Sequence, residues 1–574
     1  MSKRSATLLV TGLLIACSGN GEQPADSGSG GKVAGQGGST SASGGSSPTS
    51  GGSGNGGTAN NGGNTGAGGA QSGGSANGGA LSGGNGAGGS SAGGSSSGGA
   101  ATSGTSSTGG ATNSGGSSKG GSVSGGSTSG GATSGGSVNQ GGTSNSGGAA
   151  TSGGMVGAGG APPVSGALYV SPTGADTNSG SIDSPLYSLS VAVTKVAAGG
   201  TIYMRGGTFK YTSTINISAS GSASAPTNIL AYQSEKPVLD FSGQPYAAAQ
   251  RGILLTGNYW HILGLEISYA GDNGIKLEGS HNKIERCVFH HNGDSGIQLG
   301  FAHETVNPTG DMCSYNEIVN CDSYLNFDFD GKGGDADGFA CKMHNGKGNV
   351  FRGCRSWHNS DDGWDLYETD WPVEINNCWT WHNGDQTDFD AIYLAKMGVK
   401  MSSYSGNGNG IKLGGNGTGG NSKGRHVVRN SVAFGNNFRS KKGFDQNSHK
   451  GGVLVVNSTA WGNGYNFMFE EDAESGSSNE FVNNVSFAAG TSLGMEFSSG
   501  AILRSNSWQV GVTADASDFM ELTEAAAGAA RQADGSLPNN GFARLVAGSD
   551  LIDKGVDVQL PFTGSAPDLG AFER

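Results

Sequence analysis

The sequence predicts an all-β fold: a parallel β-helix of roughly ten coils with a short N-terminal capping helix, preceded by a long polar linker. Two observations predict it. Several segments between residues 265 and 463 repeat one pattern of short apolar runs and Asn-rich turns. Every Phe, Trp and Tyr lies at or after Tyr169, so only the C-terminal part of the 574-residue chain can build an aromatic core.

The first 17 residues are typical of an export signal. Lys3 and Arg4 precede a short apolar stretch that closes at Cys17, and the stretch is too short to span a bilayer as a helix. Residues 14–17 resemble the lipoprotein box of bacteria, which implies cleavage before Cys17 and acylation of its sulfur. Ser18 follows the cysteine in place of Asp, which resembles the outer-membrane sorting pattern of Gram-negative lipoproteins. We therefore expect an outer-membrane lipoprotein or a cell-surface or secreted protein. An ordinary signal peptide with a chance cysteine is the alternative.

Residues 18–160 consist almost entirely of Gly, Ser, Ala, Thr and Asn. So little apolar surface cannot offset the conformational entropy lost on ordering, which predicts a disordered linker. The lack of a strict three-residue period excludes collagen. As a flexible coil of about 140 residues the linker would have an r.m.s. span of roughly 65 Å. We therefore divide the chain into a lipoprotein signal peptide (1–17), a linker (18–160) and a folded domain (161–574).

The repeat in the folded domain decides the fold. A Cys is followed five residues later by Asn in IERCVFHHNGDSGIQL (284–299), IVNCDSYLN (318–326), FRGCRSWHNSDDGWDL (351–366) and INNCWTWHNGD (375–385), and later units have Ser in place of Cys. Each unit holds short strands separated by Asn, Gly and Asp turns, with no room for a helix, which indicates a solenoid of stacked strands. Neighbouring coils then lie about 4.8 Å apart, so equivalent residues form ladders.

The two ladders have different expected roles. The Asn ladder should satisfy backbone groups at a turn. The Cys ladder should be an inward stack of small buried side chains, although disulfides remain possible in an exported protein and the sequence does not give their pairing. Short helices are predicted over residues 188–198, covering the N-terminal end, and over residues 521–532. The six cysteines after the signal are Cys287, Cys313, Cys321, Cys341, Cys354 and Cys378.

The formal net charge of −13 at pH 7 argues against nucleic acid as a partner. The same charge is unfavourable for an enzyme that acts on a polyanion, unless a cation mediates the contact. No CxxC pair or histidine cluster in the sequence indicates zinc or redox chemistry.

Four aspartates form the strongest candidate site. Asp337 and Asp362 align on the repeat, so they should lie about one strand spacing apart, with Asp361 and Asp365 beside them. Four converging carboxylates cannot all ionise cheaply without a cation, and Ca²⁺ prefers such oxygen ligands. Ordinary Asx turns of a solenoid are the alternative interpretation.

A lysine aligns with these acids. Lys412 in GIKL matches Asp365 in GWDL, so the two side chains should leave the same face of the solenoid. The long interval between Cys378 and Ser431 predicts one coil with a long excursion, which places Lys412 next to the acidic residues. Lys276, in a matching NGIKL turn far from these acids, is expected to be a surface residue.

Four segments frame the domain: residues 168–193, 201–209, 228–241 and SAPDLGAFER (565–574). Three more lie inside it: ADGFACK (336–342), NSDDGWDL (359–366) and GNGIKLGG (408–415). Together these segments resemble the pectate lyases of polysaccharide lyase family nine, and the three inner segments are the sharper matches. The resemblance implies a right-handed parallel β-helix, Ca²⁺ as cofactor and Lys412 as the catalytic base. It implies as metal ligands Asp337, Asp361, Asp362 and Asp365.

The sequence departs from the family pattern in two places. Cys341 stands where a small residue is expected, and the stretch over residues 384–406 is long. The second departure leaves the shape of the cleft, and with it the preferred substrate length, open.

The implied reaction is β-elimination in polygalacturonate or another acidic polysaccharide, carried out by a monomer. Calcium would bridge the aspartates and a uronate carboxylate, while Lys412, its pKa lowered by burial and by the cation, would remove the C5 proton. Arg439, Lys441 and Lys442 are candidate contacts for flanking uronates, with a solvated basic turn as the alternative. A non-catalytic, calcium-dependent glycan-binding solenoid and a β-helix glycoside hydrolase with paired carboxylates stay open. The matching lysine argues against the hydrolase.

Overall fold

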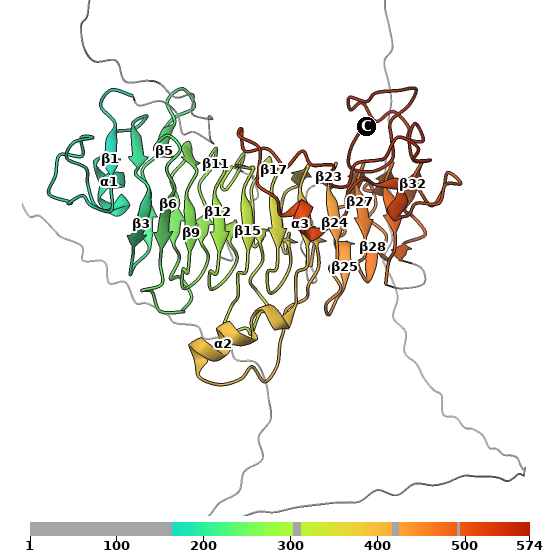
Figure 1. Cartoon of the computed structure of the whole chain (residues 1–574), viewed down its shortest axis with the longest axis horizontal. Coiled ribbons are helices and arrows are strands. Elements are labelled where there is room, and N and C mark those ends of the chain that lie inside the picture. Colours follow the sequence, from blue (N-terminus) through green and yellow to red (C-terminus); the bar gives the residue numbers. More distant parts are fainter. Residues whose placement is uncertain (1–163, 302–310, 416–423, 491–493) are drawn as a thin grey trace, which may run out of the picture. The chain divides into compact units, whose positions relative to one another are not determined.

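The computed structural model describes residues 164–301, 311–415, 424–490 and 494–574 (Figure 1). The expected signal peptide, the acylated Cys17 and the linker lie outside the described residues. No helix in the described ranges is long and apolar enough to cross a membrane.

Three parallel sheets run the length of the domain (Figure 1). The first sheet contains β1 (Leu168–Val170), β2 (Thr201–Met204), β5 (Thr227–Ala231), β8 (Trp260–Leu263), β11 (Lys283–Glu285), β14 (Glu317–Val319), β17 (Asn349–Arg352), β20 (Val373–Asn376), β23 (His426–Arg429), β26 (Val453–Val456), β29 (Asn479–Val482) and β32 (Ile502–Arg504). The second contains β3 (Gly207–Lys210), β6 (Pro237–Asp240), β9 (Glu266–Ser268), β12 (Val288–His290), β15 (Asp322–Tyr324), β18 (Arg355–Trp357), β21 (Trp379–Trp381), β24 (Val432–Phe434), β27 (Thr459–Trp461) and β30 (Val485–Phe487). The third contains β4 (Ile215–Ile217), β7 (Ile253–Leu255), β10 (Ile275–Leu277), β13 (Ile297–Leu299), β16 (Phe339–Cys341), β19 (Trp364–Asp365), β22 (Ile411–Lys412), β25 (Lys442–Asp445), β28 (Tyr465–Phe469) and β31 (Met495–Phe497).

Each coil contributes one strand to each sheet in a fixed order. β2, β3 and β4 form the first complete coil and β29, β30 and β31 form the tenth, with β1 and β32 at the two ends of the first sheet. Neighbouring strands within the three sheets pair in parallel, as in β11 with β8 and β14. The predicted parallel β-helix of roughly ten coils is therefore confirmed.

Stacked apolar side chains fill the interior. Ile262, Ile284 and Ile318 are register partners on successive strands of the first sheet, and all three are fully buried. Strand alternation places their sequence neighbours on the outer face. The repeat of apolar residues seen in the sequence is thus the inner wall of the solenoid.

Both predicted ladders are present. The Asn292 backbone N–H donates to Asn326 Oδ1 at 3.1 Å, and the Asn326 side chain donates to Asn359 Oδ1 at 2.8 Å. This chain of amides continues through Asn383, Asn436 and Asn463, all fully buried. It satisfies backbone donors at the turn between the second and third sheets, as expected.

The cysteines are free thiols. All six are buried, and none forms a disulfide. Cys287, Cys321, Cys354 and Cys378 stack inside the solenoid, where burial gives them the role of small apolar side chains. The inward stack is therefore confirmed in preference to inter-coil disulfides.

The predicted capping helix is present as α1 (Leu189–Lys195). Ser188 caps it by accepting a hydrogen bond from the Val191 N–H at 3.4 Å, and Leu189 and Val193 turn into the core at the N-terminal end of the coils. The other helical segments are α2 (Asp390–Met397), α3 (Glu524–Ala527) and the 3₁₀ turns η1 (Gln386–Asp388) and η2 (Ala516–Asp518).

The prediction of a helix over residues 521–532 was wrong in length. Only α3 forms; it ends at Ala527 with Gly528 as its C-cap, and the chain there lies against the outer face of the second sheet. There the Ala527 and Ala529 carbonyls accept hydrogen bonds from the Arg355 guanidinium, at 2.8 and 2.7 Å. Figure 1 shows this red segment reaching the middle coils.

The long excursion expected before Lys412 is also present. It leaves β21, forms η1 and α2, and returns to β22 within a single coil. Phe389, Tyr393 and Tyr404 from the excursion pack on Phe327 and Phe329 of an earlier coil. The resulting projection borders the third sheet and is seen below the coils in Figure 1.

Candidate active site

A row of register partners, three of them charged, crosses the third sheet. Ala340 on β16, Asp365 on β19, Lys412 on β22 and Asp445 on β25 are successive register partners. Their neighbours on these strands, such as Ile411 and Trp364, are buried in the core, so the row lies on the outer face. The predicted alignment of Lys412 with Asp365 is confirmed.

The other acids come from the turns that enter β16 and β19. Asp337 precedes Gly338, and Asp361 and Asp362 precede Gly363 in the next coil. A Cβ on Gly338 would lie 1.9 Å from Ser356 Oγ on β18. Only glycine therefore lets this turn pass so close to β18. The Asp362 N–H donates to Asp337 Oδ1 at 3.2 Å, which joins the two turns.

Three of the four predicted ligands converge. Asp337, Asp362 and Asp365 each offer a carboxylate oxygen within 4.8 Å of the others, and all three are buried. Asp361 is buried beside them but lies outside this group of three, with Oδ1 accepting the Asn407 N–H at 2.5 Å. We call Asp337, Asp361, Asp362 and Asp365 the aspartate cluster.

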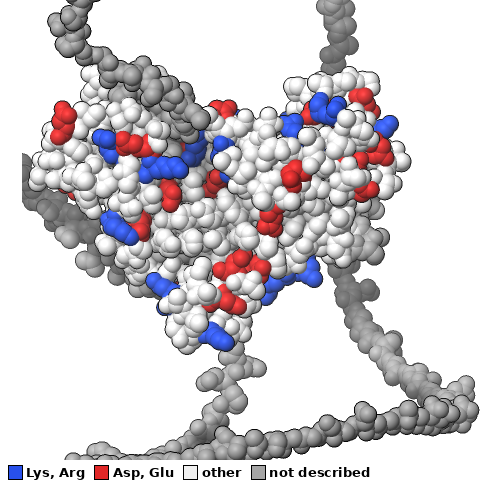
Figure 2. Space-filling model, viewed as in Figure 1, with Lys and Arg blue, Asp and Glu red and all other residues white. Residues whose placement is uncertain are grey.

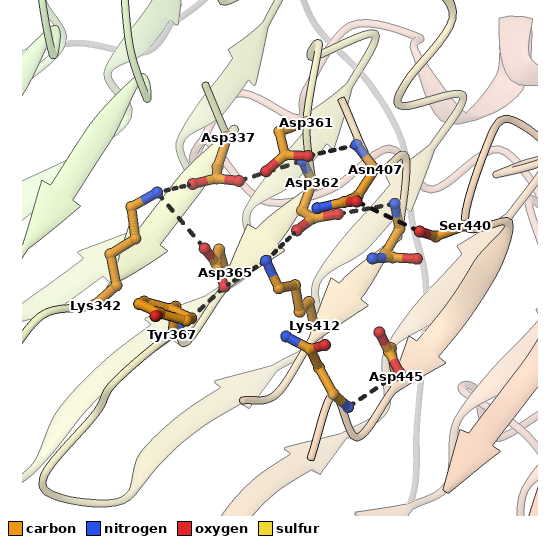
Figure 3. Close-up of polar contacts among 12 residues, drawn as sticks. Asp337, Lys342, Asp361, Asp362, Asp365, Tyr367, Asn407, Lys412, Ser440 and Asp445 are labelled. Carbon is orange, nitrogen blue, oxygen red and sulfur yellow. Dashed lines mark hydrogen bonds and ion pairs between the residues drawn. The ribbon is translucent and has the colours of Figure 1, made fainter. Parts of the chain in front are cut away.

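Two lysines are paired with the aspartate cluster (Figure 3). Lys412 Nζ lies 3.0 Å from Asp362 Oδ2 and 3.4 Å from Asp365 Oδ1. Lys342 Nζ lies 2.8 Å from Asp337 Oδ2 and 3.5 Å from Asp365 Oδ2. Asp365 is thus held between both ammonium groups.

Burial and like charge dominate the titration of the acids. Burial raises the pKa of Asp337 well above its usual range despite the nearby Lys342 charge. Burial raises the pKa of Asp361 in the same way, and the neighbouring Asp362 carboxylate adds to it. Ionising these groups together is therefore unfavourable unless positive charge is added.

The lysines respond in the opposite direction. Burial by itself lowers the pKa of Lys412, but the carboxylates of Asp362 and Asp365 outweigh burial and hold that pKa well above its usual range. The pKa of Lys342 is raised for the same reason, chiefly by Asp337 against the effect of burial. The sequence interpretation named the lowering effect of burial and missed these opposing carboxylates.

The donor set fits a calcium ion. Four carboxylates face two ammonium groups, so the cluster keeps an excess of negative charge. Asp362 Oδ2 is buried and accepts no hydrogen bond among the described residues; only the charge of Lys412 balances it. Oxygen donors without nitrogen or sulfur suit Ca²⁺. Asp337, Asp362 and Asp365 would hold the ion, with Asp361 adjacent.

Lys342 is the site residue that sequence reasoning missed. It lies in the matched segment ADGFACK, but no repeat partner marked it as functional. It leaves the end of β16, and Nζ also donates to the Asp335 carbonyl at 3.2 Å. Its role as the second countercharge depends on side-chain reach across the cluster, which spacing does not give.

The prediction that Lys276 is a surface residue was wrong. Its side chain is 1% exposed, and Nζ has no hydrogen-bond partner among the described residues. Burial lowers the pKa of Lys276 to about 8. It lies in the same row of the third sheet as Lys412, four coils earlier, and is not ion-paired with the aspartate cluster.

The basic turn lies on the coil after Lys412, as expected. The Arg439 guanidinium donates to the Tyr404 carbonyl and lies 5.9 Å from the centre of its ring, so it holds the excursion. Lys442 Nζ pairs with Asp445 at 3.0 Å. Lys441 is exposed, and its side chain has no ion-pair partner in the described ranges.

Comparison with known proteins identifies the family. The model of the Pel9A-like right-handed β-helix region matches residues 168–484. Pectate lyase L of Dickeya dadantii is 40% identical over 420 residues, which are 71% of this chain and 90% of the relative. The crystal structure of pectate lyase Pel9A is 39% identical, with a TM-score of 0.62 over 71% of this chain and 96% of that chain. A solved rhamnogalacturonan lyase is 26% identical, with a TM-score of 0.53 over 66% of this chain and 96% of that chain.

The matched region contains every strand of the aspartate cluster and Lys412. The identity to Pectate lyase L extends over most of the folded domain. The chain therefore belongs to the Pel9A-like, right-handed parallel β-helix family of pectate lyases, polysaccharide lyase family nine.

Proposed function

We propose that this protein cleaves polygalacturonate by calcium-dependent β-elimination, with Lys412 as the general base and the aspartate cluster as the calcium site. The observation that carries the proposal is the position of Lys412 Nζ, 3.0 Å from Asp362 and 3.4 Å from Asp365 in a buried group of carboxylates. The names of the Dickeya and Pel9A relatives support pectate as the substrate.

Calcium bound by the aspartate cluster would supply positive charge for the uronate carboxylate and so favour loss of the C5 proton. Lys412 then accepts that proton, and the C4–O bond breaks to leave an unsaturated sugar. The carboxylates fix Lys412 from two sides, which sets the position of Nζ before substrate arrives.

A base must be unprotonated when substrate is bound. The carboxylates of Asp362 and Asp365 keep Lys412 protonated while they lack another counterion. When they share their charge with a bound cation, burial becomes the main influence on Lys412, and burial lowers its pKa. The lysine thereby becomes a competent base only in the loaded site.

The outer face around the site provides contacts for neighbouring sugars. Lys441 is exposed one coil beyond Lys412 and is the strongest of the three basic candidates. Arg439 and Lys442 are engaged by Tyr404 and Asp445, so we expect a smaller contribution from them. The excursion between β21 and β22 would restrict the path of the polymer on one side of the third sheet.

One assay tests the proposed function against its alternatives. The protein is incubated with polygalacturonate, with and without a calcium chelator, and rhamnogalacturonan serves as the second substrate because of the rhamnogalacturonan lyase similarity. Near-ultraviolet absorbance from polygalacturonate that the chelator abolishes supports the proposal. Reducing ends without that absorbance indicate a hydrolase, and polymer depletion without product indicates a glycan-binding solenoid. Absorbance from rhamnogalacturonan alone moves the substrate to that polymer.

We also propose that the chain is an exported monomer anchored by lipid at Cys17. The sequence of residues 14–17 supports this location. Cys17→Ser should abolish lipid labelling and release the protein from the membrane fraction. Unchanged membrane association would contradict the anchor.

A further inference from the structure

Two histidines stack at the turn between the second and third sheets, and neither is ion-paired with the aspartate cluster. His358 follows β18 and His382 follows β21 in the next coil. Their ring centres lie 4.2 Å apart with an interplanar angle of 27°. Both residues have positive φ, 51° and 52°, so the same strained turn presents each imidazole outward.

Three carboxylates surround this histidine pair. Asp388 Oδ2 lies 2.7 Å from His358 Nδ1, and Asp385 Oδ2 lies 3.2 Å from His382 Nε2. Glu524 reaches both rings, 2.9 Å from His382 Nδ1 and 3.8 Å from His358 Nε2. Figure 2 shows acidic side chains on the face where the excursion meets the coils.

The charges in this group do not balance. Among the described residues, the ion-pair partners of Asp385, Asp388 and Glu524 are the two imidazoles, and no Lys or Arg pairs with them. With both imidazoles neutral the group keeps three negative charges. A bound cation would neutralise part of this charge.

The geometry fits one metal ion. His358, His382 and Asp388 each offer a ligand atom, and these atoms lie within 4.8 Å of one another. Two imidazole nitrogens with carboxylate oxygens are the donors of Zn²⁺, whereas Ca²⁺ takes oxygen alone. This group therefore differs in metal preference from the aspartate cluster.

We propose that His358, His382 and Asp388 bind a divalent transition-metal ion of the Zn²⁺ class. The ligands come from two successive coils and from η1 in the excursion. One ion would thereby fasten the excursion to the coils. The repeat aligns the two histidines, but Asp388 comes from the excursion, which the repeat does not describe.

The test measures zinc binding by the full chain in excess calcium, which keeps the aspartate cluster filled. Competition with a chromophoric zinc chelator gives affinity and stoichiometry, and Co²⁺ in place of Zn²⁺ reports tetrahedral coordination by its visible absorption. The variants are His382→Asn and Asp388→Asn. Asn tolerates the positive φ of residue 382, and Asp388→Asn keeps the side-chain shape, so the second variant carries the test if the first fails to fold.

The matched control is His344→Asn. His344 also has positive φ, 68°, and its Nδ1 lies 3.1 Å from a single carboxylate, Asp370. We expect one zinc ion per wild-type and control chain, a higher melting temperature with zinc, and an affinity reduced at least about 10-fold in both variants. The proposal is overturned if the wild-type chain binds no zinc under these conditions. It is equally overturned if Asp388→Asn binds zinc with wild-type affinity.

Discussion

Lys412 and Asp365 are register partners on adjacent strands of the third sheet, and Lys412 Nζ lies 3.4 Å from Asp365 Oδ1. The backbone ladder fixes their spacing at one strand separation, so the contact does not depend on a flexible loop. This pair joins the proposed base to the proposed calcium site.

The aspartate cluster should behave as one metal site. Asp362→Asn or Asp365→Asn keeps the side-chain shape and removes one charge, so calcium affinity should fall while added calcium restores part of the activity. Calcium titration and lyase rate measure both effects. Asp445→Asn is the control, because Asp445 is equally buried in the same row but pairs with Lys442. Wild-type calcium affinity in both cluster variants would make these residues ordinary turn residues.

Calcium binding should strengthen as pH rises. Burial raises the pKa values of Asp337 and Asp361, and a protonated carboxyl group does not bind the ion. Because the folded pKa values exceed the unfolded ones, the stability that these groups contribute without calcium is present at low pH and lost as pH rises through the folded values. The gain in melting temperature on adding calcium should therefore be larger near about pH 8 than near about pH 5. An equal gain at both would contradict the raised pKa values.

Lys342 should matter most when calcium is absent. Lys342→Met leaves Asp337 buried without its 2.8 Å partner, and loss of one partner of a buried pair costs about 3–5 kcal/mol. Calcium should offset most of that loss by neutralising the cluster. Melting temperatures with and without calcium measure the difference. A loss of the same size in both conditions would show that Lys342 acts only through packing.

Much of the architecture could be predicted from the sequence, because a solenoid repeats one local pattern. The Cys-to-Asn spacing predicted the coil and the ladders, and the match of GIKL with GWDL predicted the alignment of Lys412 with Asp365. Each of these depends on register, which the repeat carries from one coil to the next.

The features that were missed depend on contacts outside the repeat. The helical pattern over residues 521–532 did not show that the segment turns after α3 to meet Arg355. The matching turn of Lys276 did not show that its side chain is covered. The role of Lys342 became visible only through its side-chain contacts with Asp337 and Asp365. The repeat aligns the two histidines, but it does not show that Asp388 from the excursion meets them.

The linker should be dispensable for catalysis. Residues 18–160 have little apolar surface with which to contribute to a core, and the first strand, β1, begins only at Leu168. A chain that starts at Ala161 should keep the melting temperature and the specific activity of the full chain on soluble polygalacturonate. A large loss of specific activity would mean that the removed residues take part in the fold or the site.

Lys412 can be separated from the calcium site by two substitutions. Lys412→Ala removes the proton acceptor and none of the carboxylates, while Lys412→Arg keeps a positive charge that does not readily give up its proton. Lys276→Met is the control, because this lysine is buried in the same row and has no contact with the aspartate cluster. It should keep nearly the wild-type rate.

The rate of near-ultraviolet product formation by Lys412→Ala, in saturating calcium, tests the central claim most directly. Loss of a general base costs about 10²–10⁴-fold, so we expect turnover to fall at least that far while measured calcium affinity is retained. Lys412→Arg should be similarly poor. A Lys412→Ala variant that keeps more than about a tenth of the wild-type rate, outside that range, would show that another residue is the base.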